Sequence, residues 1–133
     1  MARFVIDGKT LLHLLESGRT VGPAHQLVAP ASIRSQVMDL LLRKVQDGDL
    51  TEQEALALHE QLTETKLRLL NDRVSRRTAW DIARAQGWGT ITHAECIALV
   101  KLQADALITI DVDLAAAAAK IVPVATVERL FQP

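Results

Sequence analysis

Two aspartates that each follow a short apolar segment are the residues of this chain best suited to chemistry. Val5 and Ile6 lead to Asp7, and residues 107–110 lead to Asp111. Short runs rich in β-branched residues are typical of buried parallel strands. In an open α/β sheet, ligands bind in the crevice outside the carboxyl ends of the strands. We therefore expect the two carboxylates to face one site, where a divalent metal would find the oxygen ligands it prefers.

The composition limits the class of protein. The chain has 133 residues, of which 49% are hydrophobic and 23% are charged, and this predicts one globular domain spanning residues 1–133. The formal net charge is -1, so any binding of nucleic acid must use a local patch. Cys96 is the only cysteine, which favours a reducing, cytoplasmic location and a buried thiol. We expect no membrane span, because no apolar run reaches the roughly 18 residues that one needs.

Short strands and longer helices alternate along the predicted chain. Strands are expected at 2–7, 25–29, 106–110 and 121–124, and residues 66–70 are ambiguous between strand and helix end. Helices are expected at 10–15, 33–45, from 51 onward, and at 72–86, 92–103 and 114–120. The helix starts are expected at Ser32, at Thr51 with Glu54, at Asp72, at Thr92 with Glu95, and at Asp113. This order predicts a three-layer α/β/α domain with a central, mostly parallel sheet.

The order and spacing of these segments resemble the PIN-domain family, and within it the VapC-type toxins of bacterial toxin–antitoxin pairs. The similar segments are residues 5–7, the helix after Pro30, residues 92–99 and residues 107–111. The resemblance implies a metal-dependent endoribonuclease that cleaves RNA phosphodiesters with Mg²⁺ or Mn²⁺. It also implies a cognate antitoxin as partner and a homodimer as the assembly.

The candidate metal site departs from the family pattern. Asp7 and Asp111 match its acidic positions, whereas its glutamate falls on Gln36 and its third aspartate falls on His93. Lys9 stands where a small hydroxyl residue is usual. The site therefore loses negative charge, and we expect it to hold two Mg²⁺ ions poorly. A lysine ammonium standing in place of a metal is one possibility.

Other residues of the sequence could supply the missing metal ligands in two ways. His93 is a good ligand for Mn²⁺ or Zn²⁺, so it forms a candidate metal set with Asp7, Asp111 and nearby Asp113. Asp39 lies one helical turn from the position of the missing glutamate and is a second candidate. The alternatives are that Asp113 caps a helix, that Asp39 is a solvated helix residue, that His93 merely begins a helix, and that the two strand-end aspartates are turn or cap residues.

A basic stripe is the candidate substrate-binding surface. Its members recur at helical spacing and are Arg73, Arg76, Arg77, Trp80 and Arg84. Arginine pairs with phosphate and tryptophan stacks on an unpaired base, which suits single-stranded RNA. The alternative is a solvated helix face on which Asp81 pairs with a neighbouring arginine. Thr109 is a further candidate, as a hydrogen-bond partner of a ligand or of a metal-bound water.

Two functions compete at this point. The first is a metal-dependent endoribonuclease toxin in which Asp7 and Asp111 are catalytic. The second is a PIN-fold module with a damaged metal site, which binds RNA or a partner protein without cleavage. Gln36 and Lys9 favour the second function, and the surviving strand-end aspartates favour the first.

Overall fold

The protein is described here by a computed structural model that covers residues 1–132. Its five strands are parallel and form one sheet in the order β3-β2-β1-β4-β5. The strands are β1 (Ala2–Ile6), β2 (His25–Pro30), β3 (Arg68–Leu70), β4 (Ala106–Ile108) and β5 (Val124–Ala125). The central parallel sheet that the sequence predicts is therefore confirmed.

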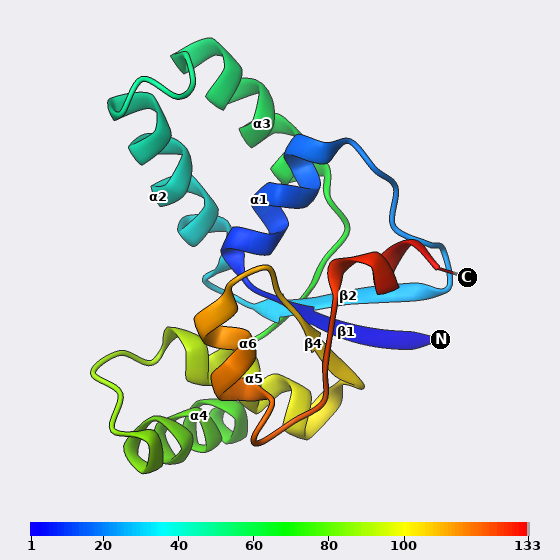
Figure 1. Ribbon diagram of the computed structural model, residues 1–133, viewed down its shortest axis with the longest axis vertical. Helices are drawn as coiled ribbons and strands as arrows, with labels where there is room; N and C mark the ends of the chain where they lie inside the picture. The colour runs from blue at the N-terminus through cyan, green and yellow to red at the C-terminus, as the bar shows by residue number, and fades with distance from the viewer. Residues whose placement is uncertain (133) are drawn as a thin grey trace.

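The helices cover both faces of the sheet, as Figure 1 shows. On one face lie α1 (Gly8–Ser17), α2 (Ile33–Gln46) and α3 (Glu52–Glu64). On the other lie α4 (Arg73–Gln86), α5 (Thr92–Gln103) and α6 (Val112–Ala118). A 3₁₀ helix, Val127–Phe131, ends the described chain. Two separate apolar clusters fill the spaces between the layers, one under each set of helices. The domain is a three-layer α/β/α sandwich.

The strand order creates a switch point between β1 and β4. The chain builds β1, β2 and β3 outward to one edge, and then returns to place β4 on the free side of β1. Right-handed crossovers that run in opposite directions put their helices on opposite faces of the sheet. The two crossovers diverge there, and the space outside the carboxyl ends of the strands at such a point is where α/β sheets bind ligands. Asp7 directly follows β1, and Asp111 lies shortly after β4.

Several helix ends are those that the sequence predicts. The Thr51 hydroxyl accepts from the Glu54 backbone N–H at 3.1 Å while the Glu54 side chain accepts from the Thr51 N–H at 2.9 Å, which is the expected capping box of α3. The Asp72 carboxylate accepts from the Ser75 N–H and begins α4. Gly87 ends α4 with φ of 71°, a left-handed conformation that favours glycine.

Two predicted caps are wrong. Thr92 is the first residue of α5 rather than its cap, and Ile91 occupies the cap position without a side-chain hydrogen bond, so the pair of Thr92 and Glu95 forms no capping box. Asp113 does not cap the last α-helix, because Asp111 caps it instead and the helix begins at Val112. In both places the helix starts earlier than the predicted motif, and at α6 the reason is local, because the Asp111 carboxylate accepts from the first backbone N–H groups of the helix.

The boundaries of other elements also differ from expectation. The ambiguous segment contains strand β3, and the predicted strands 106–110 and 121–124 are shorter, with β5 displaced toward the C-terminus. The first helix begins directly after Asp7, earlier than residue 10. No helix within residues 1–132 combines the length and the apolar character needed to cross a membrane.

Candidate functional site

Asp7 follows β1, the middle strand, at the edge of the sheet where the parallel strands end, which we call the carboxyl edge. It is buried, with 7% of its surface exposed. It occupies the cap position of α1 but makes no side-chain cap hydrogen bond. Its Oδ1 atom instead accepts hydrogen bonds from the hydroxyls of Thr10 and Thr109, the latter at 3.0 Å. The carboxylate is therefore fixed by two buried hydroxyls, one from its own helix and one from the end of β4.

Both hydroxyls are themselves held by the backbone of the turn after β4. The Ile110 N–H donates to Thr10 Oγ1 at 3.0 Å, and the Asp111 N–H donates to Thr109 Oγ1 at 3.0 Å. Each threonine thus accepts from the turn and donates to Asp7. These four hydrogen bonds link the ends of β1 and β4, which the sequence predicts to lie close together. Each hydroxyl donates its single proton to Asp7.

Asp111 has a structural task of its own. Its Oδ1 accepts from the backbone N–H groups of Asp113 and Leu114, at 3.0 and 3.1 Å, and so caps α6. Its Oδ2 lies 3.9 Å from Nε2 of His93. That separation is too long for a hydrogen bond.

His93 lies at the first turn of α5, half-buried, with its ring packed edge-on against Trp88 at 6.2 Å between centroids. His93 therefore lies between Asp111 at the carboxyl edge and Trp88 in the loop that connects α4 and α5. The histidine is at the edge of the site rather than remote from it.

Gln36 packs against the beginning of α1. A Cβ atom added at Gly8 would lie 2.9 Å from Gln36 Cβ, so the two helices approach closely just beside Asp7. The Gln36 amide donates to the Ser32 hydroxyl at 2.9 Å. Asp39, the alternative carboxylate, is exposed on α2. Lys9 is also exposed, and within the described chain it forms no ion pair with either site aspartate.

The residues at this edge fit a multi-carboxylate metal site poorly. Among residues 1–132, no three His, Cys, Asp or Glu side chains are grouped so that they could hold one ion. Asp7 and Asp111 contribute two carboxylates, and one oxygen of each already accepts two hydrogen bonds. Asp113 is exposed and contributes its backbone N–H to the cap of α6. A pair of Mg²⁺ ions needs more free oxygen ligands than this edge presents.

The basic stripe divides into two parts in the structure. Arg76, Trp80 and Arg84 line one hollow of about 560 Å³ beside the α4–α5 loop. Arg73 and Arg77 do not line it, and Arg77 pairs with Asp81 at 3.2 Å. The pairing that the sequence offers as an alternative therefore occurs, but only for one arginine of the stripe.

Two further residues of this hollow, Trp88 and Glu95, were not predicted to be functional. Trp88 lies between Gly87, which ends α4, and Gly89, and no local pattern marks it as a ligand-binding residue. The sequence predicts that Glu95 belongs to a capping box, which does not form. Burial raises the pKa of the Glu95 carboxyl above its usual value. Glu95 also borders a second, much smaller hollow, of about 10 Å³, at the carboxyl ends of β2 and β3.

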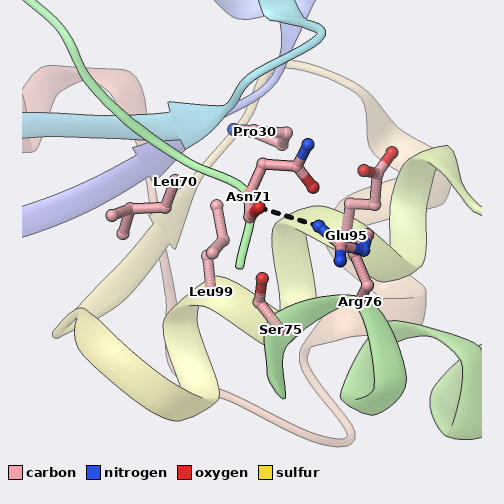
Figure 2. A pocket seen from close by; sticks show the side chains of 7 residues that line it. All are labelled: Pro30, Leu70, Asn71, Ser75, Arg76, Glu95 and Leu99. Atoms are coloured by element: carbon pink, nitrogen blue, oxygen red, sulfur yellow. Dashed lines mark hydrogen bonds between the residues drawn. The ribbon is translucent and has the colours of Figure 1, made fainter. Parts of the chain in front are cut away.

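Figure 2 shows how this small hollow is built. Pro30 and Leu70 come from the strand ends, Leu99 and Ser75 from the helices below, and Arg76 and Glu95 close one side. The Arg76 guanidinium donates to the Asn71 carbonyl at 2.9 Å, which fixes the arginine over the opening. Arg76 and Glu95 belong to both hollows and so separate one from the other.

Cys96 is buried, as expected, with 1% of its surface exposed. Burial raises the pKa of its thiol, and the nearby carboxylates of Asp7 and Glu95 raise it further. The thiol is therefore neutral and serves as a small apolar side chain of the core.

Comparison with known proteins identifies the fold. No protein-family model and no curated sequence match the chain. Among solved structures, PAE2754 from Pyrobaculum aerophilum superposes with a TM-score of 0.72 at 17% identity, covering 97% of this chain and 93% of that one. VapBC-1 from nontypeable Haemophilus influenzae superposes with a TM-score of 0.61 at 14% identity, covering 93% of this chain and 97% of that one. The chain has a three-layer PIN-like fold similar to that of VapC-type proteins.

Proposed function

We propose that this chain is a toxin-type PIN-fold protein that binds RNA at the carboxyl edge of its sheet, with Mg²⁺-dependent cleavage impaired or lost. One observation carries the proposal. The edge retains only Asp7 and Asp111 as carboxylates, and both are engaged in hydrogen bonds that hold the fold. The candidate binding surface beside them keeps two arginines and an exposed tryptophan, whereas the candidate metal-binding set has few carboxylates.

The case for RNA depends on the hollow next to the edge. Arg76 and Arg84 supply cations, and Trp80 supplies an exposed aromatic face between them. The whole chain carries a formal net charge of -1, so these local cations are what would attract a phosphate backbone. Stacking on tryptophan requires an unpaired base, which favours single-stranded RNA over a duplex.

The case against Mg²⁺ chemistry depends on charge. Gln36 beside Asp7 is neutral, and His93 stands opposite Asp111 in place of a carboxylate. Mg²⁺ favours oxygen ligands and keeps several of its waters, and imidazole is a poor ligand for it. Two partly committed carboxylates therefore give a weak site for this ion.

A second candidate function is favoured by one distance. The 3.9 Å between His93 Nε2 and Asp111 Oδ2 is somewhat more than the roughly 3.0–3.5 Å expected for two ligands of one transition-metal ion. A small movement would let both bind Mn²⁺ or Zn²⁺, with Asp7 and Asp113 as the other candidate ligands. On this alternative the chain is an endoribonuclease with altered metal preference, and Asp7 and Asp111 are its catalytic residues.

The proposal includes the partners expected of a VapC-type protein. A cognate antitoxin would restrain the protein, and a second copy of the chain would form a homodimer. Large apolar side chains remain exposed on the helices of one layer, Leu42 on α2 and Leu56 on α3. Such side chains support protein–protein contact.

RNA binding and RNA cleavage are tested on the same samples. A labelled single-stranded RNA pool is titrated with the protein in EDTA, and cleavage is then followed with Mg²⁺ and with Mn²⁺. We expect binding in EDTA and intact RNA with Mg²⁺. Asp7→Asn is the diagnostic variant, and Asp47→Asn, in the exposed turn after α2, is its matched control.

The outcomes separate the two functions. Cleavage with Mn²⁺ that disappears in Asp7→Asn and persists in Asp47→Asn establishes the second candidate. Absence of RNA binding under every condition refutes both. Circular dichroism of each variant verifies that the loss of a hydrogen bond at Asp7 has not unfolded the domain.

A further inference from the structure

The hollow between α4, the α4–α5 loop and α5 contains both tryptophans of the chain. Its volume is about 560 Å³, which is ample for one nucleobase. Its lining includes Arg76, Trp80, Arg84, Trp88 and Glu95. We call this hollow the tryptophan groove. Trp88 packs against His93, which places the groove next to the carboxyl edge.

The aromatic side chains of the groove are available to a ligand. Trp80 exposes 59% of its surface, although a ring of this size is normally covered in a folded domain. Trp88 is half-buried and is held by the edge-on contact with His93. A flat, exposed ring beside a fixed one is suited to stacking with a planar base.

The cations of the groove are also available. Arg76 and Arg84 lie one helical turn before and after Trp80, so they flank its ring on the same face of α4. Neither forms an ion pair with a carboxylate anywhere in residues 1–132, in contrast to Arg77. Arg76 uses one guanidinium nitrogen on the Asn71 carbonyl and keeps the others. Two phosphates on either side of a stacked base would meet these two guanidinium groups.

Glu95 gives the groove a feature that phosphate binding does not explain. Its carboxylate is half-buried and accepts no hydrogen bond from any side chain or cap in the part of the chain that the structure describes. A carboxylate repels phosphate, so its presence among cations and aromatic rings calls for a ligand that donates hydrogen bonds. The Watson–Crick edge of guanine presents two adjacent donors, N1–H and the N2 amino group, which match the two oxygens of a carboxylate. Adenine, cytosine and uracil each present one donor group on that edge.

We infer that the tryptophan groove is a subsite for one unpaired guanine of a single-stranded RNA, with Trp80 stacked on the base, Arg76 and Arg84 on its flanking phosphates, and Glu95 accepting from its N1–H and N2 amino group. The inference rests on the proposed RNA-binding function, which it makes specific. It assigns base recognition to Glu95, a residue outside the candidate metal set.

Intrinsic fluorescence tests the inference directly, because both tryptophans lie in the groove. The ligands are uridine octamers that carry one central guanine, adenine, cytosine or inosine, and titrations are run in EDTA. We expect the guanine octamer to quench the emission and to bind roughly 5- to 150-fold more tightly than the adenine octamer, the discrimination typical of a bidentate base contact. Inosine, which lacks the N2 amino group, is expected to lose much of this preference.

Glu95→Gln is the decisive variant, and Glu60→Gln, exposed on α3 and remote from the groove, is the matched control. Gln keeps the size of the side chain but presents a donor to the base, so the guanine preference should fall to within about twofold of unity. Glu60→Gln should retain it. Equal binding of all four octamers by the wild type, or an unchanged preference in Glu95→Gln, overturns the inference even if RNA binds tightly.

A mononucleotide arm separates this inference from the proposed function. Titration with GMP and AMP probes the groove without a polymer. Quenching by GMP but not by AMP, lost in Glu95→Gln, supports the guanine subsite even if no RNA octamer binds, in which case the proposed RNA-binding function fails alone. If octamers bind without selectivity and GMP does not quench, the function stands and the subsite is refuted.

Discussion

Replacing Thr109 by valine removes one hydroxyl from the centre of the carboxyl edge while keeping the branched shape of the side chain. The hydroxyl donates to Asp7 Oδ1 at 3.0 Å and accepts from the Asp111 N–H at 3.0 Å. Thr109 is 8% exposed, so water cannot readily replace it. The variant leaves Asp7 with the Thr10 hydroxyl as its remaining side-chain donor and leaves the Asp111 N–H without its acceptor.

The magnitude follows from these two losses. A hydrogen bond to a charged group contributes roughly 1.5–3 kcal/mol, and a buried donor left without a partner costs roughly 1–3 kcal/mol. The Asp111 N–H lies nearer the surface, and the added methyl group of valine recovers part of the loss. We therefore expect the free energy of unfolding to fall by about 2–4 kcal/mol, a large part of the 5–15 kcal/mol typical of a domain.

Urea unfolding followed by circular dichroism measures this change. Thr109→Ser keeps the hydroxyl and loses one methyl group, so it should cost only about 1 kcal/mol. Thr63→Val is the matched surface control, because the exposed Thr63 hydroxyl bonds only to the His59 carbonyl of its own helix. Its free energy of unfolding should stay within about 0.5 kcal/mol of wild type.

One result would refute the reasoning. If Thr109→Val unfolds within about 0.5 kcal/mol of the wild type, the relay from the β4–α6 turn to Asp7 does not stabilise the fold. If that variant instead loses RNA affinity without losing stability, Thr109 contacts the ligand, as the sequence suggests, and Asp7 is not committed to the network.

Four further predictions concern the same edge and the helices beside it. Gly8→Ala should lower the free energy of unfolding by about 1–3 kcal/mol, seen as a lower urea midpoint, because the new Cβ would lie 2.9 Å from Gln36 Cβ. Asp111→Asn should keep the α6 cap and unfold like the wild type, whereas Asp111→Ala should lose about 0.5–2 kcal/mol in the same assay. Cys96 should react with Ellman's reagent only as fast as the protein unfolds, because burial and two carboxylates raise the pKa of its thiol. Glu95→Gln should raise the free energy of unfolding at pH 7, and this gain should shrink at acidic pH. The pKa of Glu95 is raised in the folded protein, so the side chain's contribution to stability is lost as the pH rises through that pKa. A difference between variant and wild type that does not change with pH in urea titrations would contradict this assignment.

The strand-end aspartates show what local sequence predicts well. Short β-branched runs identify the buried strands β1 and β4, and parallel strands must release their carboxyl ends at one edge. The closeness of Asp7 to Thr109, two residues before Asp111, follows from that geometry. The pattern does not predict which hydrogen bonds the Asp7 carboxylate accepts. The Thr109 hydroxyl reaches Asp7 only because β4 pairs with β1, and the Thr10 hydroxyl donates to the same oxygen.

Two capping motifs show where local sequence fails. Thr51 and Glu54 form the predicted box, whereas Thr92 and Glu95 share the same pattern and form none. The start of α5 is fixed by tertiary contacts, with Ala94 completely buried against the sheet and His93 packed on Trp88. Tertiary packing therefore overrides the local preference, and Glu95 is left to line the tryptophan groove.

The groove itself is beyond local prediction. Helical spacing places Arg76, Trp80 and Arg84 on one face of α4, and this much of the stripe is predictable from the sequence. The angle between α4 and α5, and the loop that brings Trp88 into the same hollow, depend on how both helices pack on the sheet. A single sequence gives the residues of one wall but not the position of the other.

Calorimetric titration of the protein with Mg²⁺ and with Mn²⁺ tests the central claim most directly, because it asks whether the carboxyl edge holds a metal at all. The reduced carboxylate set predicts no measurable heat of Mg²⁺ binding in the low millimolar range, and the same baseline for Asp7→Asn. Saturable Mg²⁺ binding that disappears in both Asp7→Asn and Asp111→Asn, while both variants remain folded, would contradict this claim. It would favour the hypothesis of a metal-dependent nuclease instead.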